Sequence, residues 1–165
     1  MKGILKNRFI EIYSNNLKSQ LINKGFGNKQ DNYLEIDFFE GLFLLEKNKM
    51  KIYLDNKIIL KKDFISYSEK KIKNFKEKYI VYKDFKEKGY IIKDGAIFGF
   101  DFRIYEGKTK KHEHTKYVVD VKKTHKDEMS QIIKSERLAN SINAEYVIAI
   151  IDMDQKIIKI KIKRI

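Results

Sequence analysis

The stretch from Phe98 to Val121 holds the side chains best suited to chemistry. Its sequence, FGFDFRIYEGKTKKHEHTKYVVDV, contains two runs of alternating apolar and polar residues around a polar loop. If the two runs pair as a hairpin, Tyr105 and His114 lie near each other at its mouth. The loop between them also carries three lysines, Lys108, Lys110 and Lys111. A phenol, an imidazole and a pool of positive charge are what metal-free cleavage of an RNA phosphodiester requires.

An ordinary surface hairpin with polar tips is the other interpretation of these residues. In either case two strands must position them. The first run predicts a strand with one apolar face, made of Phe98, Phe100, Phe102 and Ile104. Asp101, Arg103 and Tyr105 then lie on the opposite face. The second run alternates through Thr115, Tyr117, Val119 and Val121, which predicts the partner strand.

The same stretch contains a second pattern, typical of a different class of nuclease. Asp101 and the sequence Asp120-Val121-Lys122 resemble the Asp…(Asp/Glu)-x-Lys arrangement of metal-dependent restriction-like nucleases. In such sites two carboxylates hold Mg²⁺ and the lysine helps to orient water. Because this chain is rich in lysine, Asp-x-Lys is a weak signal, and the metal-dependent nuclease remains an alternative.

The charge of the chain favours a polyanionic partner. The formal net charge is +13, and most of the excess falls after residue 66. A basic surface of this size attracts nucleic acid above all. All but four of the 36 basic residues are lysine, so a lysine-biased genome is an alternative explanation of the charge.

The cysteine and histidine content limits the types of site that the chain can form. The chain has no cysteine, which excludes disulfides, thiolate zinc sites and a cysteine nucleophile. Its only histidines, His112, His114 and His125, are a poor supply for a metal site, and we predict no metal and no cofactor. No apolar run approaches a membrane span, and the N-terminus lacks the apolar core of a signal peptide. We therefore expect a cytoplasmic protein with no membrane association.

The first part of the chain predicts a small α+β domain over residues 1–66. Residues 4–13 are expected to form one strand and residues 17–22 a second short one. Asp37 precedes an apolar run and has Glu40 three residues later, which predicts a capping box and a helix. Two short β segments, joined at Asp55 and Asn56, follow this helix.

The second part, residues 67–165, predicts the order α-β-β-β-α-β-β. Its second helix spans roughly 125–142, and its core-facing residues are expected to be Met129, Ile132, Ile133, Leu138 and Ile142. YVIAII predicts a strand covered on both faces. The last segment alternates strictly, with Ile158, Ile160 and Ile162 on one face. The fold class is therefore α+β or mixed α/β, with a mixed central sheet flanked by helices.

At these residues the chain resembles a known family. YIVYKDFKEKGYIIKDGAIFGFDFRIYEG, followed by EHTKYVV, RLANS and YVIAIID at these spacings, is similar to archaeal tRNA-intron (tRNA-splicing) endonuclease subunits. The resemblance is strong over about residues 77–155, and FFEGLFLLEKNKMKI extends it to the first domain. It implies a restriction-endonuclease-like second domain and metal-free cleavage of pre-tRNA at bulge–helix–bulge junctions. The products are a 2′,3′-cyclic phosphate and a 5′-OH.

The resemblance also implies roles for residues. It implies that Tyr105 is the general base, that His114 is the general acid and that Arg137 stacks on a bulged base. Without the resemblance, a surface ion pair with Glu136 or Asp101 is the simpler role for Arg137. The family's catalytic lysine falls on Ala144, whose methyl group cannot stabilise a phosphorane. Three lysines are candidates to replace it, Lys122, Lys123 and Lys134, and none is compelling.

The missing lysine favours a structural subunit of a hetero-oligomer over a catalytic one. The resemblance implies assembly, because family members often combine two kinds of subunit, one catalytic and one structural, and we expect a tetramer. The structural subunit inserts an acidic loop into the basic groove of its partner. Asp152 and Asp154 stand where that loop is expected, although a plain β-turn is the alternative. The apolar face of the last strand predicts association through the C-terminal sheet, with a second subunit or with another copy of this chain.

Overall fold

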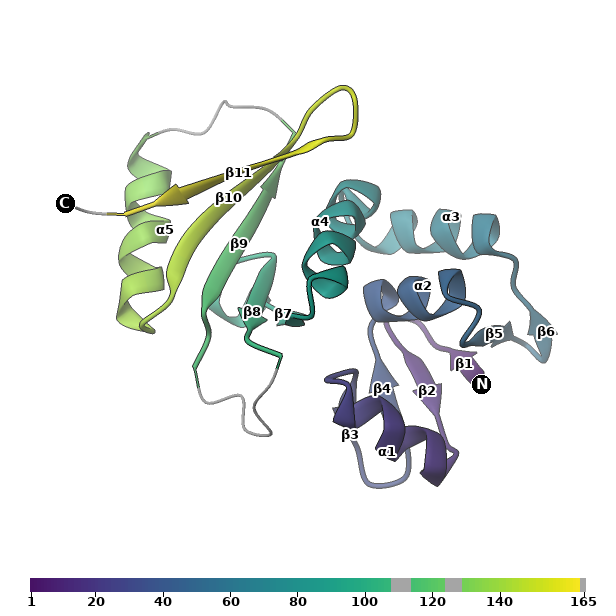
Figure 1. Cartoon of the computed structure of the whole chain (residues 1–165). Helices are drawn as coiled ribbons and strands as arrows, with labels where there is room; N and C mark the ends of the chain where they lie inside the picture. The colour runs from purple at the N-terminus through teal and green to yellow at the C-terminus, as the bar shows by residue number, and fades with distance from the viewer. Residues whose placement is uncertain (108–113, 124–128, 164–165) are drawn as a thin grey trace. The chain divides into compact units, whose positions relative to one another are not determined.

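The computed structural model describes residues 1–107, 114–123 and 129–163. The chain forms two compact units, Met1–Lys76 and Glu77–Ile165 (Figure 1). Within the described ranges, no helix has the length and apolar character needed to cross a membrane. The predicted α+β class is confirmed, with one sheet in each unit.

The first unit is built on a six-stranded sheet of order β3-β4-β2-β1-β5-β6. Its strands are β1 (Lys2–Leu5), β2 (Ile10–Ile12), β3 (Asn28–Lys29), β4 (Leu34–Ile36), β5 (Lys51–Leu54) and β6 (Lys57–Ile58). β1 and β5 are parallel, and the other pairs are antiparallel. The helices are α1 (Asn15–Asn23), α2 (Phe38–Glu46) and α3 (Lys61–Lys71).

Local signals in this unit gave mixed results. The capping box is confirmed, because Asp37 accepts from the Glu40 N–H and the Glu40 side chain accepts from the Asp37 N–H. The single strand over 4–13 is wrong: the Lys6 N–H donates to the Phe9 carbonyl, which closes a turn between β1 and β2. The strand over 17–22 is also wrong, because these residues lie in α1, where Leu21 is buried.

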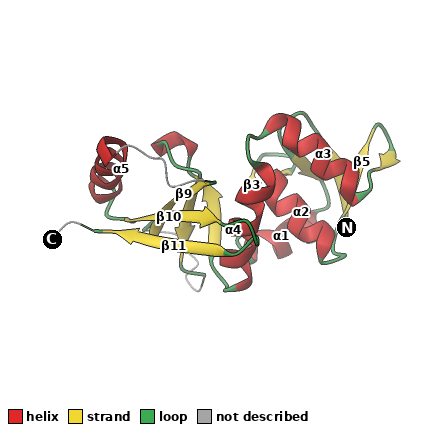
Figure 2. Ribbon diagram, turned by 90° about the horizontal axis from the view of Figure 1, so that it is seen from above, coloured by secondary structure: helices red, strands yellow, loops and turns green. Residues whose placement is uncertain are grey.

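The second unit has the predicted order α-β-β-β-α-β-β. Its elements are α4 (Phe75–Glu87, which starts two residues before the unit boundary), β7 (Ile91–Asp94), the 3₁₀ turn η1 (Ala96–Phe98), β8 (Phe102–Tyr105), β9 (Tyr117–Lys122), α5 (Met129–Ser141), β10 (Glu145–Ile151) and β11 (Ile157–Ile162). The sheet order is β11-β10-β9-β8-β7 (Figure 1), and Figure 2 shows β11 beside β10. β9 and β10 are parallel and the other pairs antiparallel, so the predicted mixed sheet is confirmed.

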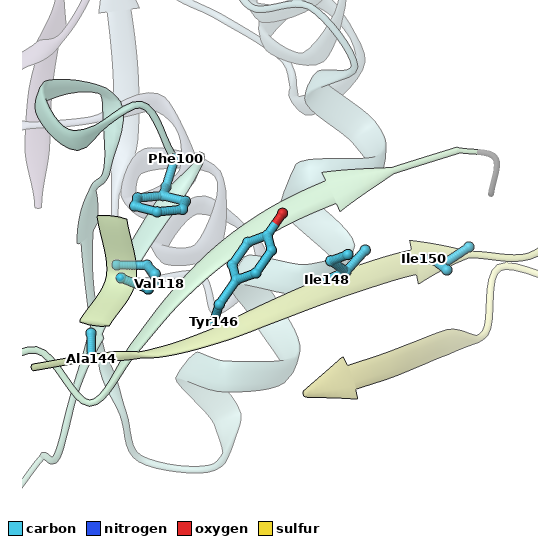
Figure 3. Packing of buried hydrophobic residues seen from close by; sticks show 7 residues of the cluster. Phe100, Val118, Ala144, Tyr146, Ile148 and Ile150 are labelled. Carbon is cyan, nitrogen blue, oxygen red and sulfur yellow. The ribbon is translucent and has the colours of Figure 1, made fainter. Parts of the chain in front are cut away.

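Each face of this second sheet packs against one helix. On one face the ring of Phe102 lies 6.2 Å from that of Tyr82 on α4. On the other face a buried cluster joins α5 to the sheet, with Phe100, Val118, Ala139, Ala144, Tyr146, Ile148 and Ile150 as its members (Figure 3). Residues 146–151 of β10 are all buried, which confirms the prediction of a strand covered on both faces.

The predicted apolar face of the first hairpin strand is wrong. Phe98 belongs to η1, and β8 begins only at Phe102. Gly99 between them has φ +77°, a left-handed conformation that suits glycine and turns the chain. Because the strand starts only at Phe102, the alternation does not extend back to Phe98 and Phe100, which pack into the cluster under α5, whereas Phe102 contacts α4 on the opposite face of the sheet.

The predicted core face of α5 is partly wrong. Met129 is 69% exposed, Ile133 42% and Leu138 41%. The side that meets the sheet is instead formed by Ile132, Ser135, Glu136, Ala139 and Ile142. Apolar residues occur around most of this helix, so their spacing did not define the buried side.

Candidate active site

Tyr105 is the last residue of β8 and lies at the end of the strand that leads into the loop. Arg103 pairs with Val118 and Val118 pairs with Tyr146, and both Val118 and Tyr146 belong to the cluster under α5. Arg103 therefore lies on the α5 side of the sheet, and so does Tyr105, two residues later in the strand. The Tyr105 side chain is only 8% exposed. The packed sheet therefore holds the ring in place.

His114 is exposed and lies three residues before β9. β8 and β9 are antiparallel neighbours, so the end of β8 and the start of β9 lie at the same end of the sheet. The predicted pairing of the two runs is confirmed, and it brings Tyr105 and His114 to one end. Lys108, Lys110 and Lys111 lie outside the described residues, and so do His112 and His125.

The mouth of this hairpin is closed by contacts that sequence reasoning missed. Glu106, next to Tyr105, forms an ion pair with Lys116, which holds the pKa of the Glu106 carboxyl below its usual range. A Cβ on Gly107 would collide with the carbonyl oxygen of Gly89, just after α4. The chain that leaves Tyr105 therefore passes so close to Gly89 that only glycine fits.

Arg103 is a second residue that the sequence analysis did not assign to the site. Its guanidinium carbon lies 5.3 Å from the centre of the Phe98 ring and 6.0 Å from that of Tyr105. Its Nε donates a 2.9 Å hydrogen bond to the Asp94 carbonyl on β7. The alternation of β8 placed Arg103 and Tyr105 on one face, and this was the signal that could have identified it.

Ala144 lies in the apolar cluster under α5 and is 4% exposed (Figure 3). Of the three lysines considered as replacements, Lys123 is paired with Glu77 at 2.7 Å. Lys122 ends β9 and Lys123 follows it, so both lie at the other end of that strand from His114. Lys134 is exposed in the middle of α5.

Arg137 is exposed on α5, two turns before Ala144. The ion pair considered for it with Glu136 or Asp101 is not formed within the described ranges. Glu136 is buried and bonds Asn140, while Asp101 is paired with Lys78. The Arg137 guanidinium is thus available on the helix surface.

The carboxylates of the metal-dependent alternative lie close together but have protein partners. Asp101 pairs with Lys78 at 2.6 Å and accepts a 2.8 Å hydrogen bond from the Val121 N–H. Asp120 accepts a 2.8 Å hydrogen bond from the Tyr146 hydroxyl. Burial, followed by the negative charge of Asp101, raises the pKa of Asp120. Among the residues described, no three His, Asp or Glu side chains are grouped to hold a metal ion.

The raised pKa of Asp120 predicts a pH-dependent effect on stability. A carboxyl whose pKa is higher in the folded state stabilises the protein below its unfolded pKa, and this contribution is lost as pH rises through the folded pKa. The ionised form of Asp120 therefore costs stability at neutral pH. We expect Asp120→Asn to unfold at a higher temperature than the wild type at pH 7, because Asn still accepts from Tyr146.

The difference should shrink below about pH 4, where the unfolded chain is also protonated. Thermal unfolding midpoints between pH 3 and 8 measure this. Asp101→Asn is the matched control, and it should be less stable than the wild type at pH 7 because it loses its ion pair with Lys78. An Asp120→Asn protein that is less stable than the wild type at pH 7 would contradict the raised pKa of the Asp120 carboxyl.

Among the described residues, β11 is an edge strand with β10 as its one neighbour in the sheet. On one face of it Lys159 forms an ion pair with Asp84 of α4 and lies 4.1 Å from the centre of the Phe85 ring. On the other face Ile158 is 45% exposed and Ile160 39%, while Ile162 is partly buried against the α5 cluster.

The connection between β10 and β11 is a tight turn that contains both acidic residues. The Asp152 carboxylate accepts a 2.7 Å hydrogen bond from the Lys156 N–H, and Gln155 has φ +60°. Met153 and Asp154 between them are exposed. The β-turn considered for this segment is therefore present, and its tip presents one apolar and one acidic side chain.

Comparison with known proteins gives consistent matches over both units. Residues 1–65 match the model of the tRNA intron endonuclease N-terminal domain, and residues 75–159 that of the tRNA intron endonuclease catalytic C-terminal domain. The chain is 31% identical over 156 residues to a tRNA-splicing endonuclease of Methanococcus maripaludis, covering 93% of this chain and 88% of the relative. It is 33% identical to that of Methanococcus vannielii, with the same coverage, and 31% identical to that of Pyrococcus furiosus, covering 86% and 82%.

Proposed function

The chain belongs to the tRNA intron endonuclease family, and we propose that it is a subunit of an enzyme that cuts pre-tRNA at bulge–helix–bulge intron junctions without a metal ion. The observation that carries this proposal is the antiparallel pairing of β8 and β9, which brings Tyr105 and His114 to one end of the sheet. The family membership gives these two residues an RNA substrate.

In the proposed reaction the 2′-OH attacks the adjacent phosphorus. The O2′–P bond forms, the P–O5′ bond breaks, and the products are a 2′,3′-cyclic phosphate and a 5′-OH. Tyr105, as the phenolate, takes the proton from O2′, and His114, as the imidazolium, gives a proton to the departing O5′. The rigid packing of the Tyr105 ring suits a base that must be held in line, and the exposure of His114 suits an acid that must exchange its proton with solvent.

The basic residues of the site are proposed to bind the RNA. Lys108, Lys110 and Lys111 would meet the phosphates near the cleaved bond, because they stand between Tyr105 and His114 in the sequence. Arg137 would stack on an unpaired base, and its guanidinium has no carboxylate partner among the described residues. The +13 formal charge supports a polyanionic substrate in the same way.

The enzyme is proposed to be an oligomer, with another copy of this chain or with a second subunit, as a dimer or a tetramer. The apolar face of β11 with Ile158, Ile160 and Ile162 would form the contact between sheets. The exposed turn with Asp152 and Asp154 would reach into a basic groove of the neighbour.

One observation favours a second role, that of a structural subunit which binds but does not cut. Ala144 brings no charge to the site and is packed in the core. The test is to assay the pure chain on a bulge–helix–bulge RNA, alone and after mixing with a candidate second subunit. Cleavage by the pure chain would contradict the structural role, and cleavage only by the mixture would support it.

The metal-dependent alternative, with Asp101, Asp120 and Lys122, is separated from the main proposal by chelation. We expect cleavage by the active assembly to be unchanged in excess EDTA, since no step of the proposed reaction uses a metal ion. The 5′ fragment should carry a 2′,3′-cyclic phosphate, which acid opens to a mixture of 2′- and 3′-phosphates. Loss of cleavage in EDTA, with recovery on adding Mg²⁺, would overturn the proposal in favour of the metal-dependent nuclease.

A further inference from the structure

Arg103 differs from the other basic residues that the structure places near Tyr105. Its guanidinium lies against the rings of Phe98 and Tyr105, and its Nε is fixed by the Asp94 carbonyl. These contacts hold the planar group in one orientation. Arginine stacks on aromatic faces in this way and keeps its terminal N–H groups in a rigid fork.

Within the described ranges this guanidinium has no carboxylate partner. Lys116, at the mouth of the same hairpin, is instead paired with Glu106. Among the described residues, the guanidinium donates only from its Nε, to a neutral carbonyl, and the residue is partly exposed. A preorganised, unneutralised guanidinium next to a site residue is suited to binding phosphate oxygens.

The chemistry at the phosphorus requires such a charge. When O2′ attacks, the pentacoordinate phosphorus carries more negative charge on its non-bridging oxygens than the phosphodiester does. A cation aimed at these oxygens stabilises the transition state more than the ground state. The buried methyl group of Ala144 cannot supply it, and Lys122 and Lys123 lie at the other end of β9.

We propose that Arg103 is a catalytic residue that binds the non-bridging oxygens of the scissile phosphate and stabilises the pentacoordinate transition state. This inference rests on the proposed function and makes this chain a catalytic subunit. Arg103 stays protonated throughout. The proton of O2′ goes to Tyr105, and the proton for O5′ comes from His114, so the balance of the reaction is unchanged.

The test compares Arg103→Gln, Arg103→Lys and Lys93→Gln in the assembled enzyme. Lys93 pairs directly with Arg103 across β7 and β8, so Lys93→Gln removes a positive charge from the same face one strand further from Tyr105. We expect Arg103→Gln to lower the single-turnover cleavage rate about 10²–10³-fold. Arg103→Lys should recover part of the rate, because the charge returns without the fork, and Lys93→Gln should keep the wild-type rate.

Two binding measurements separate a catalytic role from general RNA binding. The first uses an RNA with a 2′-deoxy nucleotide at the cleavage site, and its affinity should change less than about threefold in Arg103→Gln. The second uses a uridine–vanadate complex, whose pentacoordinate vanadium resembles the transition state, and its affinity should fall about as much as the rate. Equal loss of both affinities, or no loss of either, would overturn the role of Arg103.

The outcomes also distinguish this inference from the proposed function. If the wild type cleaves and Arg103→Gln cleaves equally well, the inference fails and the function stands. Suppose that the wild type, alone and in mixtures, does not cleave, and that it binds the vanadate complex no more tightly than Arg103→Gln does. In that case the inference about Arg103 and the proposed function both fail. Thermal unfolding midpoints show whether each variant is folded, and the vanadate affinity of Arg103→Lys decides the question if Arg103→Gln is unstable.

Discussion

Replacement of His114 by alanine is expected to lower the rate of pre-tRNA cleavage about 10²–10⁴-fold, the usual contribution of a positioned general acid. The side chain is exposed, so its removal leaves no cavity and should not alter folding. Affinity for a non-cleavable RNA should stay near the wild-type value. Single-turnover cleavage and a binding titration with the same RNA measure the two effects.

A modified substrate shows whether His114 acts on the leaving group. If sulfur replaces the bridging 5′-oxygen at the cleavage site, the leaving thiolate needs no proton, and the His114→Ala protein should cleave this RNA nearly as fast as the wild type does. Thr115→Ala, at the next position, is the matched control and should cleave both substrates normally. Wild-type cleavage of the natural RNA by His114→Ala would remove His114 from the reaction.

Replacement of Ile160 by lysine is expected to abolish association through β11. Ile160 lies on the exposed face of an edge strand, between two other isoleucines of that face, Ile158 and Ile162. In a two-fold symmetric contact each substitution occurs twice. Loss of the buried side chain from both copies costs roughly 3–6 kcal/mol, which weakens the dimer about 10²–10⁴-fold before the cost of burying two ammonium groups is added.

The mass in solution, measured by sedimentation or light scattering over a range of concentrations, tests this expectation. Lys161→Gln is the control, because Lys161 is on the same strand but on the opposite face, where it pairs with Glu145. It should keep the oligomeric state of the wild type. A dimer that survives Ile160→Lys at the same concentrations would place the interface elsewhere.

Some features of this protein follow from short segments of sequence and needed no tertiary information. The capping box at Asp37 and Glu40, the continuous apolar strand over 146–151 and the alternating last strand are each set by neighbouring residues. The two alternating runs around the loop also predicted the β8–β9 pair. That pairing is enough to bring Tyr105 and His114 to one end of the sheet.

Other features were decided by residues far apart in the chain. Phe98 and Phe100 lie on the opposite side of the sheet from Phe102, because β8 begins only at Phe102 and the alternation that the sequence suggests does not extend back to them. The buried side of α5 depends on which sheet residues it meets, and an apolar pattern around most of the helix does not specify it.

The sequence by itself determined the order of the elements in the second unit, the family, and the strand pairing that brings Tyr105 and His114 to one end of the sheet. Only the tertiary structure placed Arg103 against two rings and the carbonyl of Asp94. Only it paired Asp101 with Lys78 and, among the described residues, left Arg103 without a carboxylate partner. The physical reason is that a helix cap and the apolar pattern of a strand depend on neighbours in sequence. The partners of a charged side chain depend instead on strand register and helix packing, which bring together residues that no local pattern connects.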